Sequence, residues 1–153
     1  FKTNVDASFI NNGGIRLPSI AAGNITRGKI FELSPFDNMI VLLKVDGKTL
    51  HQFLDTVASK GGWPSAGCTY QLKYKRAVNI NVDGKPIQDN SEYTIALTDY
   101  VANGGDNCDM LKTIPQQTNG YLFRDAVIEY FADMQKQGKK LTAKIENRVT
   151  NAE

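Results

Sequence analysis

The sequence is poor in the residues from which hydrolytic sites are usually built. His51 is the only histidine, and the two cysteines, Cys68 and Cys108, stand at no metal-ligand spacing. A catalytic zinc or two-metal site draws on several histidine and carboxylate ligands. A Ser-His-Asp arrangement would need His51, and no nucleophile motif accompanies it. We therefore predict neither catalytic residues nor a metal site in this chain.

Long apolar runs and a strong charge of one sign are also lacking. No stretch is apolar enough to span a membrane. The net charge is +2 and the basic residues are scattered, so the chain lacks the basic footprint of a nucleic-acid-binding protein. We expect no membrane span and no nucleic-acid partner.

A starting methionine and a signal peptide are absent as well, because the chain opens with Phe1. We therefore expect a piece of a longer protein, from which any targeting segment has been removed. The two cysteines leave two alternatives open: they pair in an oxidising compartment, or they stay as buried free thiols.

What is present suits a globular domain. The chain has 153 residues, 41% of them hydrophobic, enough for a single domain over residues 1–153. Periodicity and turn residues predict strands at 7–10, 39–45, 69–74, 77–82 and 92–97, and helices at 27–33, 50–60 and 123–137. Weak alternation predicts a closing strand within 141–149. The mixture, without regular βαβ alternation, predicts an α+β fold with mixed or antiparallel sheets packed against helices.

Caps and apolar stripes support these helices. Thr26 and Thr49 are the predicted N-caps of the first two. The stripe of helix 50–60 consists of Leu50, Phe53, Leu54 and Val57. The stripe of helix 123–137, which we also assign to the core, consists of Phe123, Ala126, Val127, Tyr130, Phe131 and Met134.

The stretch 98–106 concentrates groups suited to ligand binding. Tyr100, Asn103, two glycines and Asp106 follow the strand 92–97 within a few residues. The glycine pair permits a sharp turn, so the polar side chains can point to one place beside the Tyr100 ring. A ring for stacking and a carboxylate for hydroxyl groups suit a nucleoside or a sugar. The alternative is an ordinary strand exit in which Asn103 and Asp106 bind their own backbone.

Two further loops carry candidate binding residues. In segment 11–16, glycine amides can face a ligand, and Arg16 can bind phosphate or carboxylate through two nitrogens. The alternative there is a tight loop with Arg16 in a salt bridge. In segment 35–38, Phe36 follows a proline and precedes Asn38 by two residues. The ring of Phe36 is either a core residue or an exposed stacking surface.

The three loops together resemble the C-terminal domain of the 5'-nucleotidase family, which includes UDP-sugar hydrolases and 2',3'-cyclic phosphodiesterases. The matching segments are Asn11-Asn12-Gly13-Gly14-Ile15-Arg16, Pro35-Phe36-Asp37-Asn38 and Tyr100-Val101-Ala102-Asn103-Gly104-Gly105-Asp106. The turn at 23–26 and the hairpin at 83–87 are also similar. The resemblance covers the chain from about Val5 to Phe131.

The resemblance implies the fold of that domain and a set of roles at a nucleotide. Phe36 and Tyr100 would sandwich the base, and Asn38 would contact it. Asp106 would accept hydrogen bonds from the ribose hydroxyls. Stacking on aromatic rings contributes roughly 1–3 kcal/mol per base. Tyr100 stands where phenylalanine is commoner in the family.

The same resemblance implies a phosphate end to the site. Asn11, Gly14 and Arg16 match the family's loop beside the reacting phosphate, with Arg16 binding it. Asn12 stands where many members have glycine. The family's upstream helix, which carries a further phosphate-binding arginine, is not in this chain.

A division of labour follows from the resemblance. In the family, a separate N-terminal metallophosphoesterase domain holds a divalent metal pair and hydrolyses the ester. We therefore expect a nucleotide-recognition domain of a hydrolase, without a cofactor of its own, whose catalytic partner domain lies on the same or a separate chain. The expected location is extracytoplasmic, either periplasmic or at the cell surface. The alternatives are a scaffold that has lost nucleotide binding and a sugar- or nucleoside-binding module.

Overall fold

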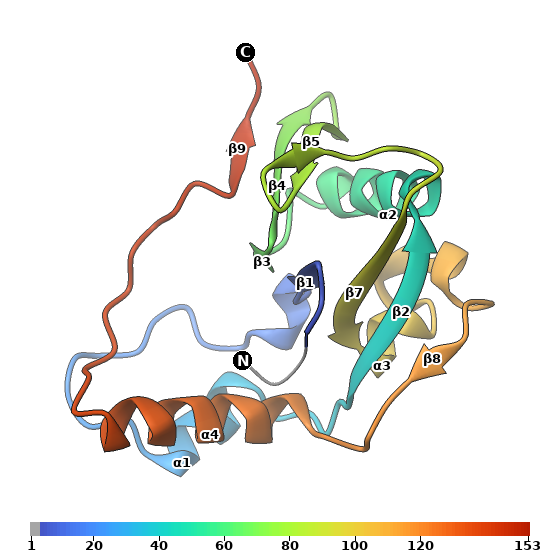
Figure 1. Cartoon of the computed structure of the whole chain (residues 1–153). Helices are drawn as coiled ribbons and strands as arrows, with labels where there is room; N and C mark the ends of the chain where they lie inside the picture. The colour runs from blue at the N-terminus through green and yellow to red at the C-terminus, as the bar shows by residue number, and fades with distance from the viewer. Residues whose placement is uncertain (1–3) are drawn as a thin grey trace.

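The computed structural model describes residues 4–153. Four α-helices lie in this part of the chain: α1 (Arg27–Leu33), α2 (Gly47–Ser59), α3 (Asp99–Ala102) and α4 (Phe123–Lys136). The strands are β1 (Ala7–Phe9), β2 (Ile40–Asp46), β3 (Ser65–Ala66), β4 (Cys68–Lys73), β5 (Arg76–Val82), β6 (Lys85–Pro86), β7 (Glu92–Thr98), β8 (Gln116–Gln117) and β9 (Val149–Asn151) (Figure 1). Short 3-10 turns lie at Asn12–Gly14, Gly105–Asn107 and Asp109–Leu111.

The larger sheet brings the candidate loops to one edge. Its strand order is β3-β1-β7-β2-β8, with β1 and β7 parallel and the other pairs antiparallel. The loops that follow β1 and β7 therefore leave the sheet at the same end. Because Ile40 at the start of β2 pairs with Thr98 at the end of β7, the loop before β2 enters at that end as well.

The smaller sheet and α2 enclose the core. The strand order is β6-β5-β4-β9, with β4 and β9 parallel. The predicted stripe of α2 is fully buried, and Phe53 in it makes edge contacts with Phe9 and Trp63, at ring-centroid distances of 5.2 and 5.9 Å. The Tyr70 hydroxyl lies in the same core, where it accepts from the Trp63 amide and donates to the Trp63 carbonyl. The core therefore joins α2 to strands of both sheets.

The helix caps agree with the sequence in one case and correct it in the other. Thr26 accepts the Lys29 amide at 3.2 Å and caps α1 as predicted. The prediction of Thr49 as a cap was wrong, because Asp46 accepts the Thr49 amide at 2.7 Å and starts α2 earlier. Asp is as strong an N-cap as any residue. This hydrogen bond lowers the pKa of the Asp46 carboxyl.

Helix α4 departs most from its prediction. Arg124 is its buried residue, whereas the side chains of the expected core stripe are half-buried and Tyr130 is exposed. Figure 1 shows α4 lying beside α1 rather than flat on a sheet. The amphipathic pattern was present, but it could not reveal that a cavity would separate this face from the sheet.

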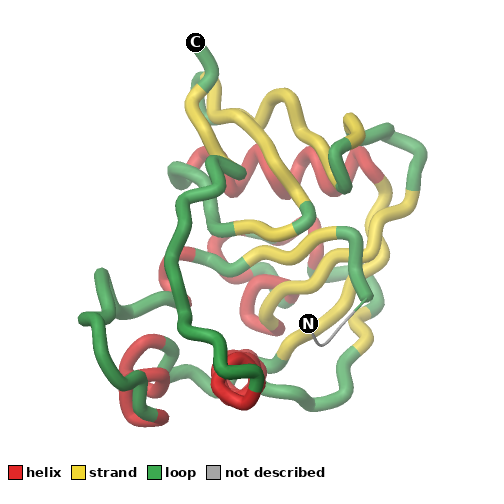
Figure 2. Tube along the Cα trace, turned by 60° about the vertical axis from the view of Figure 1, so that its left-hand side comes forward, coloured by secondary structure: helices red, strands yellow, loops and turns green. Residues whose placement is uncertain are grey.

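The closing strand is shorter and later than predicted. Only Val149–Asn151 forms β9, which pairs with β4 through Tyr70↔Val149. Residues 137–148 run along the molecule from α4 to β9 (Figure 2). The prediction of a strand within 141–149 was wrong because its alternation had no burial to support it: Leu141 and Ile145 are exposed.

The cysteines and the histidine have structural positions. Cys68 and Cys108 are buried free thiols, and burial raises their pKa values to about 12 and about 11. A protonated, buried thiol is a small apolar group rather than a nucleophile. The His51 ring nitrogen Nε2 lies 3.3 Å from the Ala77 carbonyl oxygen and joins α2 to β5.

Candidate functional site

Loop 11–16 is fixed by a side-chain contact to the stretch after β7. Asn11 is 6% exposed, and its Nδ2 donates to Asp106 Oδ2 at 2.7 Å. Gly14 lies against the same amide, since a Cβ there would stand 2.9 Å from Asn11 Oδ1. The hydrogen bond joins residues 95 positions apart. It places the two predicted polar groups, one from each loop, side by side.

Asp106 owes its position to an unusual backbone turn. Its φ of 56° and that of Gly104 at 90° lie in the left-handed region. Non-glycine residues adopt this conformation uncommonly, and Asp and Asn are enriched among those that do. The prediction that the glycine pair produces a sharp turn is therefore confirmed at Gly104.

Asp99 ties the other two loops together. Its Oδ1 accepts hydrogen bonds from Asn38 Nδ2 at 2.9 Å, from the Met39 amide at 3.1 Å and from the Tyr100 amide at 2.9 Å. Asn38 lies two residues after Phe36. One carboxylate oxygen therefore sets the spacing between the Phe36 loop and Tyr100.

Both candidate rings are accessible. Phe36 is 43% exposed and Tyr100 is 48% exposed, so neither is a core residue. Gly105 packs against Tyr100, because a Cβ there would lie 2.5 Å from the ring carbon Cε1 and 2.5 Å from the Tyr100 carbonyl oxygen. Only glycine leaves room for the ring in this position.

Arg16 lies beside the Phe36 ring. Its guanidinium carbon is 5.8 Å from the ring centroid, and Nη1 reaches the Gly13 carbonyl at 3.5 Å. No carboxylate within residues 4–153 pairs with Arg16, which speaks against the salt-bridge alternative. The side chain leaves most of its donors available for an anion.

Two residues of this network escaped the sequence analysis. Asp99 directly precedes Tyr100 at the end of a strand. This position next to a candidate ring was the only feature of the sequence that indicated a role for Asp99 in the site. Arg124 binds the loop at Pro35 and Phe36 from the first turn of α4. A cation there opposes the helix dipole, and this mismatch was the available signal.

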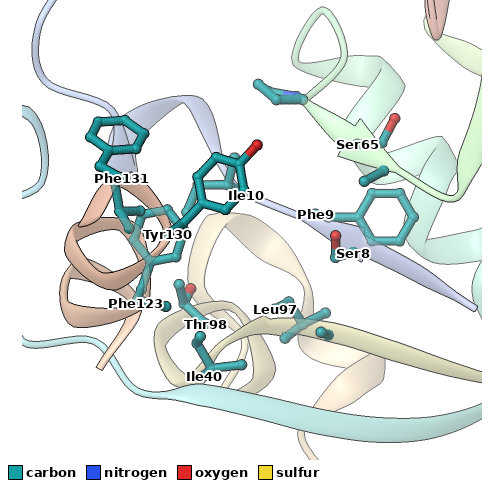
Figure 3. A pocket seen from close by; sticks show the side chains of 15 residues that line it. Ser8, Phe9, Ile10, Ile40, Ser65, Leu97, Thr98, Phe123, Tyr130 and Phe131 are labelled. Carbon is teal, nitrogen blue, oxygen red and sulfur yellow. The ribbon is translucent and has the colours of Figure 1, made fainter. Parts of the chain in front are cut away.

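A cavity of about 400 Å³ opens elsewhere, between α4 and the larger sheet. Figure 3 shows Phe123 and Tyr130 of α4 facing Ser8, Phe9, Leu97 and Thr98. None of the seven candidate site residues lines it. The residues within 4–153 that line it carry no charge, so they offer no cation to a phosphate group.

The described residues contain neither a metal-ligand cluster nor a membrane-spanning helix. Within 4–153, no cluster of three or more His, Cys, Asp and Glu side chains is placed to hold a metal ion. No helix of that range combines the length and the apolar character needed to cross a membrane.

Comparison with known proteins identifies the family. The family model described as the C-terminal domain of 5'-nucleotidases matches residues 1–113. The chain belongs to the 5'-nucleotidase C-terminal domain family. It is 28% identical over 135 residues to protein UshA of Yersinia enterocolitica, which covers 84% of this chain and 24% of that protein. It is 30% identical over 145 residues to the NAD 5'-nucleotidase of Haemophilus influenzae, which covers 82% and 23%.

Solved structures show the same 5'-nucleotidase fold. The 5'-nucleotidase precursor of Thermus thermophilus aligns over 97% of this chain and 32% of its own, with a TM-score of 0.86 and 26% identity. The Haemophilus influenzae NAD nucleotidase aligns with a TM-score of 0.78 over 97% of this chain and 30% of its own, at 24% identity. The predicted α+β fold and family are thereby confirmed. The chain spans about a quarter of the length of the curated relatives.

Proposed function

We propose that this 5'-nucleotidase C-terminal domain binds the base and ribose of a nucleotide. One observation carries the proposal: Asp99 joins the loop of one exposed ring, Phe36, to the segment of the other, Tyr100. Two accessible rings on rigidly linked segments suit a flat aromatic ligand between them. Stacking contributes roughly 1–3 kcal/mol per base and tolerates different bases.

Polar groups for the rest of a nucleotide lie on the same loops. Asp106 is the group we assign to the ribose hydroxyls, since a carboxylate forms charge-assisted hydrogen bonds with them. Its bond to Asn11 leaves acceptor capacity, because a carboxylate has about four lone-pair sites. Arg16, beside Phe36, is the group we assign to the phosphate.

We assign hydrolysis to a separate metallophosphoesterase domain. The relatives named 5'-nucleotidase and NAD 5'-nucleotidase are about four times as long as their matching part, so they have room for one. The divalent metal pair belongs to that domain in this proposal, and it would polarise the phosphate there. The present chain would position the substrate, in an extracytoplasmic compartment.

The proposal is tested by titrating the chain with adenosine and AMP, followed by NMR or calorimetry. Phe36→Ala and Tyr100→Ala are expected to weaken adenosine binding about tenfold each, because each removes one stacking face. Tyr74→Ala is the matched control, since Tyr74 is an exposed aromatic on the β4–β5 turn. The Tyr74→Ala variant should bind adenosine with the affinity of the wild type.

The other outcomes separate the alternatives. Equal adenosine affinity in all four proteins would remove Phe36 and Tyr100 from the site. A preference for an oligosaccharide over adenosine would favour a sugar-binding module. Association with a metallophosphoesterase chain, without nucleotide binding by either the pair or the isolated chain, would favour a scaffold.

A further inference from the structure

Arg124, a residue of α4, binds the loop 35–38 that carries the Phe36 ring. It is 7% exposed and lies in the first turn of α4. Its Nη1 donates to the Pro35 and Phe36 carbonyls, each at 3.3 Å, and Nη2 pairs with Asp37 Oδ1 at 2.5 Å. Three consecutive residues around the candidate ring are therefore bound by one guanidinium.

The guanidinium is itself immobilised. Its central carbon lies 4.1 Å from the centroid of the Phe31 ring of α1, a cation–π contact. Burying a guanidinium is costly unless its donors are used. Here both terminal nitrogens are used, whereas Nε has no hydrogen-bond partner among the described residues. The planar fork of arginine matches two carbonyls and a carboxylate at once, which the ammonium of lysine does not.

Backbone contacts extend this hold to the other end of the loop. The Phe123 amide donates to the Asn38 carbonyl at 2.9 Å, and Met39 forms a bridge with Leu122. The Asn38 side chain then reaches Asp99, next to Tyr100. The start of α4 thus connects, through loop 35–38, to the segment of the second ring.

We propose that Arg124 is a positioning residue for nucleotide recognition, which fixes the Phe36 ring at the distance from Tyr100 that a base requires. The proposal rests on the proposed function above. Arg124 touches no ligand in this scheme and acts through the Phe36 backbone. Helix α4 would thus contribute to recognition without contributing a contact. Arg124 also lies beyond residues 1–113, the part matched by the family model.

A double-mutant cycle tests the proposal. Adenosine affinity is measured by NMR titration for the wild type, Arg124→Lys, Phe36→Leu and the double variant. We expect Arg124→Lys to weaken binding about tenfold in the wild-type background and to have little effect beside Phe36→Leu, because the two residues act as a unit. Arg27→Lys, an exposed arginine of α1, is the matched control and should bind as the wild type does.

A second readout separates positioning from support of the fold. In Arg124→Lys saturated with adenosine, nuclear Overhauser contacts from the Phe36 ring to the base should be lost while those from Tyr100 persist. Urea unfolding shows whether each variant is folded. Asp37→Asn keeps both carbonyl contacts and should weaken binding about threefold; it serves if the lysine variant does not fold.

Several results would overturn the proposal. Equal losses in the wild-type and Phe36→Leu backgrounds would show that Arg124 acts only on stability. Unchanged affinity in both Arg124→Lys and Asp37→Asn would show that the loop needs no such hold. Either result, with adenosine bound by the wild type, leaves the proposed function intact. If the wild type binds no adenosine, both the role of Arg124 and the proposed function are refuted.

Discussion

Single polar side chains, rather than the apolar core, set the relative positions of the three loops. Asn11 bridges to Asp106, Asp99 receives three donors, and Arg124 binds three neighbouring residues. Partly buried hydrogen bonds of this kind are costly to leave half-made. Replacing one partner of such a hydrogen bond therefore disturbs a loop more than replacing one partner of an exposed contact would.

Arg16 provides a prediction at this scale. Arg16→Ala should lower the affinity for AMP about tenfold and leave the affinity for adenosine within about twofold, because the side chain is assigned to the phosphate. Calorimetry of both ligands, at low and at moderate salt, measures the ratio. Equal losses for AMP and adenosine would place Arg16 at the base instead, as a support for Phe36.

At the scale of elements, α2 and the paired strands form the support on which the loops stand. The parallel pairing of β1 with β7, and the antiparallel pairing of β7 with β2, force three loops to one edge of the sheet. The stripe of α2 buries itself against strands of both sheets. Loops that carry ligand groups are commonly positioned by a rigid scaffold of this kind.

Phe53 provides the prediction for α2. Phe53→Ala should lower the free energy of unfolding by about 3–5 kcal/mol, since it removes a fully buried ring and leaves a cavity. Gln52→Ala, at the exposed neighbouring position, is the control and should change it by less than about 0.5 kcal/mol. Urea unfolding of the two variants measures the difference. Similar losses for both would contradict the assignment of this face to the core.

Local patterns predicted the elements whose signals are strong and close together. The stripe of α2 and the cap of α1 at Thr26 are each encoded within a few neighbouring residues, and both predictions are confirmed. Asp46, which caps α2, is harder to predict because glycine follows it, and Asp-Gly is also a turn signal. The cavity beside α4 and the short β9 depend on partners far along the chain, so no local pattern could reveal them. Arg124 left one local signal, a cation in the first turn of a helix, but its partners at Pro35 and Phe36 are also distant in sequence.

For the whole molecule, the core combines apolar packing with buried groups that must stay neutral. Burial raises the pKa of Cys68 to about 12, of Tyr70 to about 12 and of Cys108 to about 11; a nearby Asp106 adds to the last. The unfolded chain ionises these groups at lower pH than the folded one. Their contribution to stability is therefore complete below about pH 9 and is lost as the pH rises toward the folded values.

An alkaline titration tests this property. The urea midpoint should be steady from pH 7 to about pH 9 and should then fall continuously toward pH 11. Cys68→Ala should show a shallower fall than the wild type, since one of the raised groups is gone. A midpoint that stays level up to pH 11 would mean that these groups are not desolvated.

The central claim is that a base lies between Phe36 and Tyr100. The most direct measurement is the set of nuclear Overhauser contacts between adenosine and selectively labelled Phe and Tyr rings of the wild-type chain. We predict that the base protons contact both rings, and that Phe36→Ala and Tyr100→Ala each remove one set. Contacts to only one of the rings, or to the side chains that line the cavity beside α4, would contradict the claim.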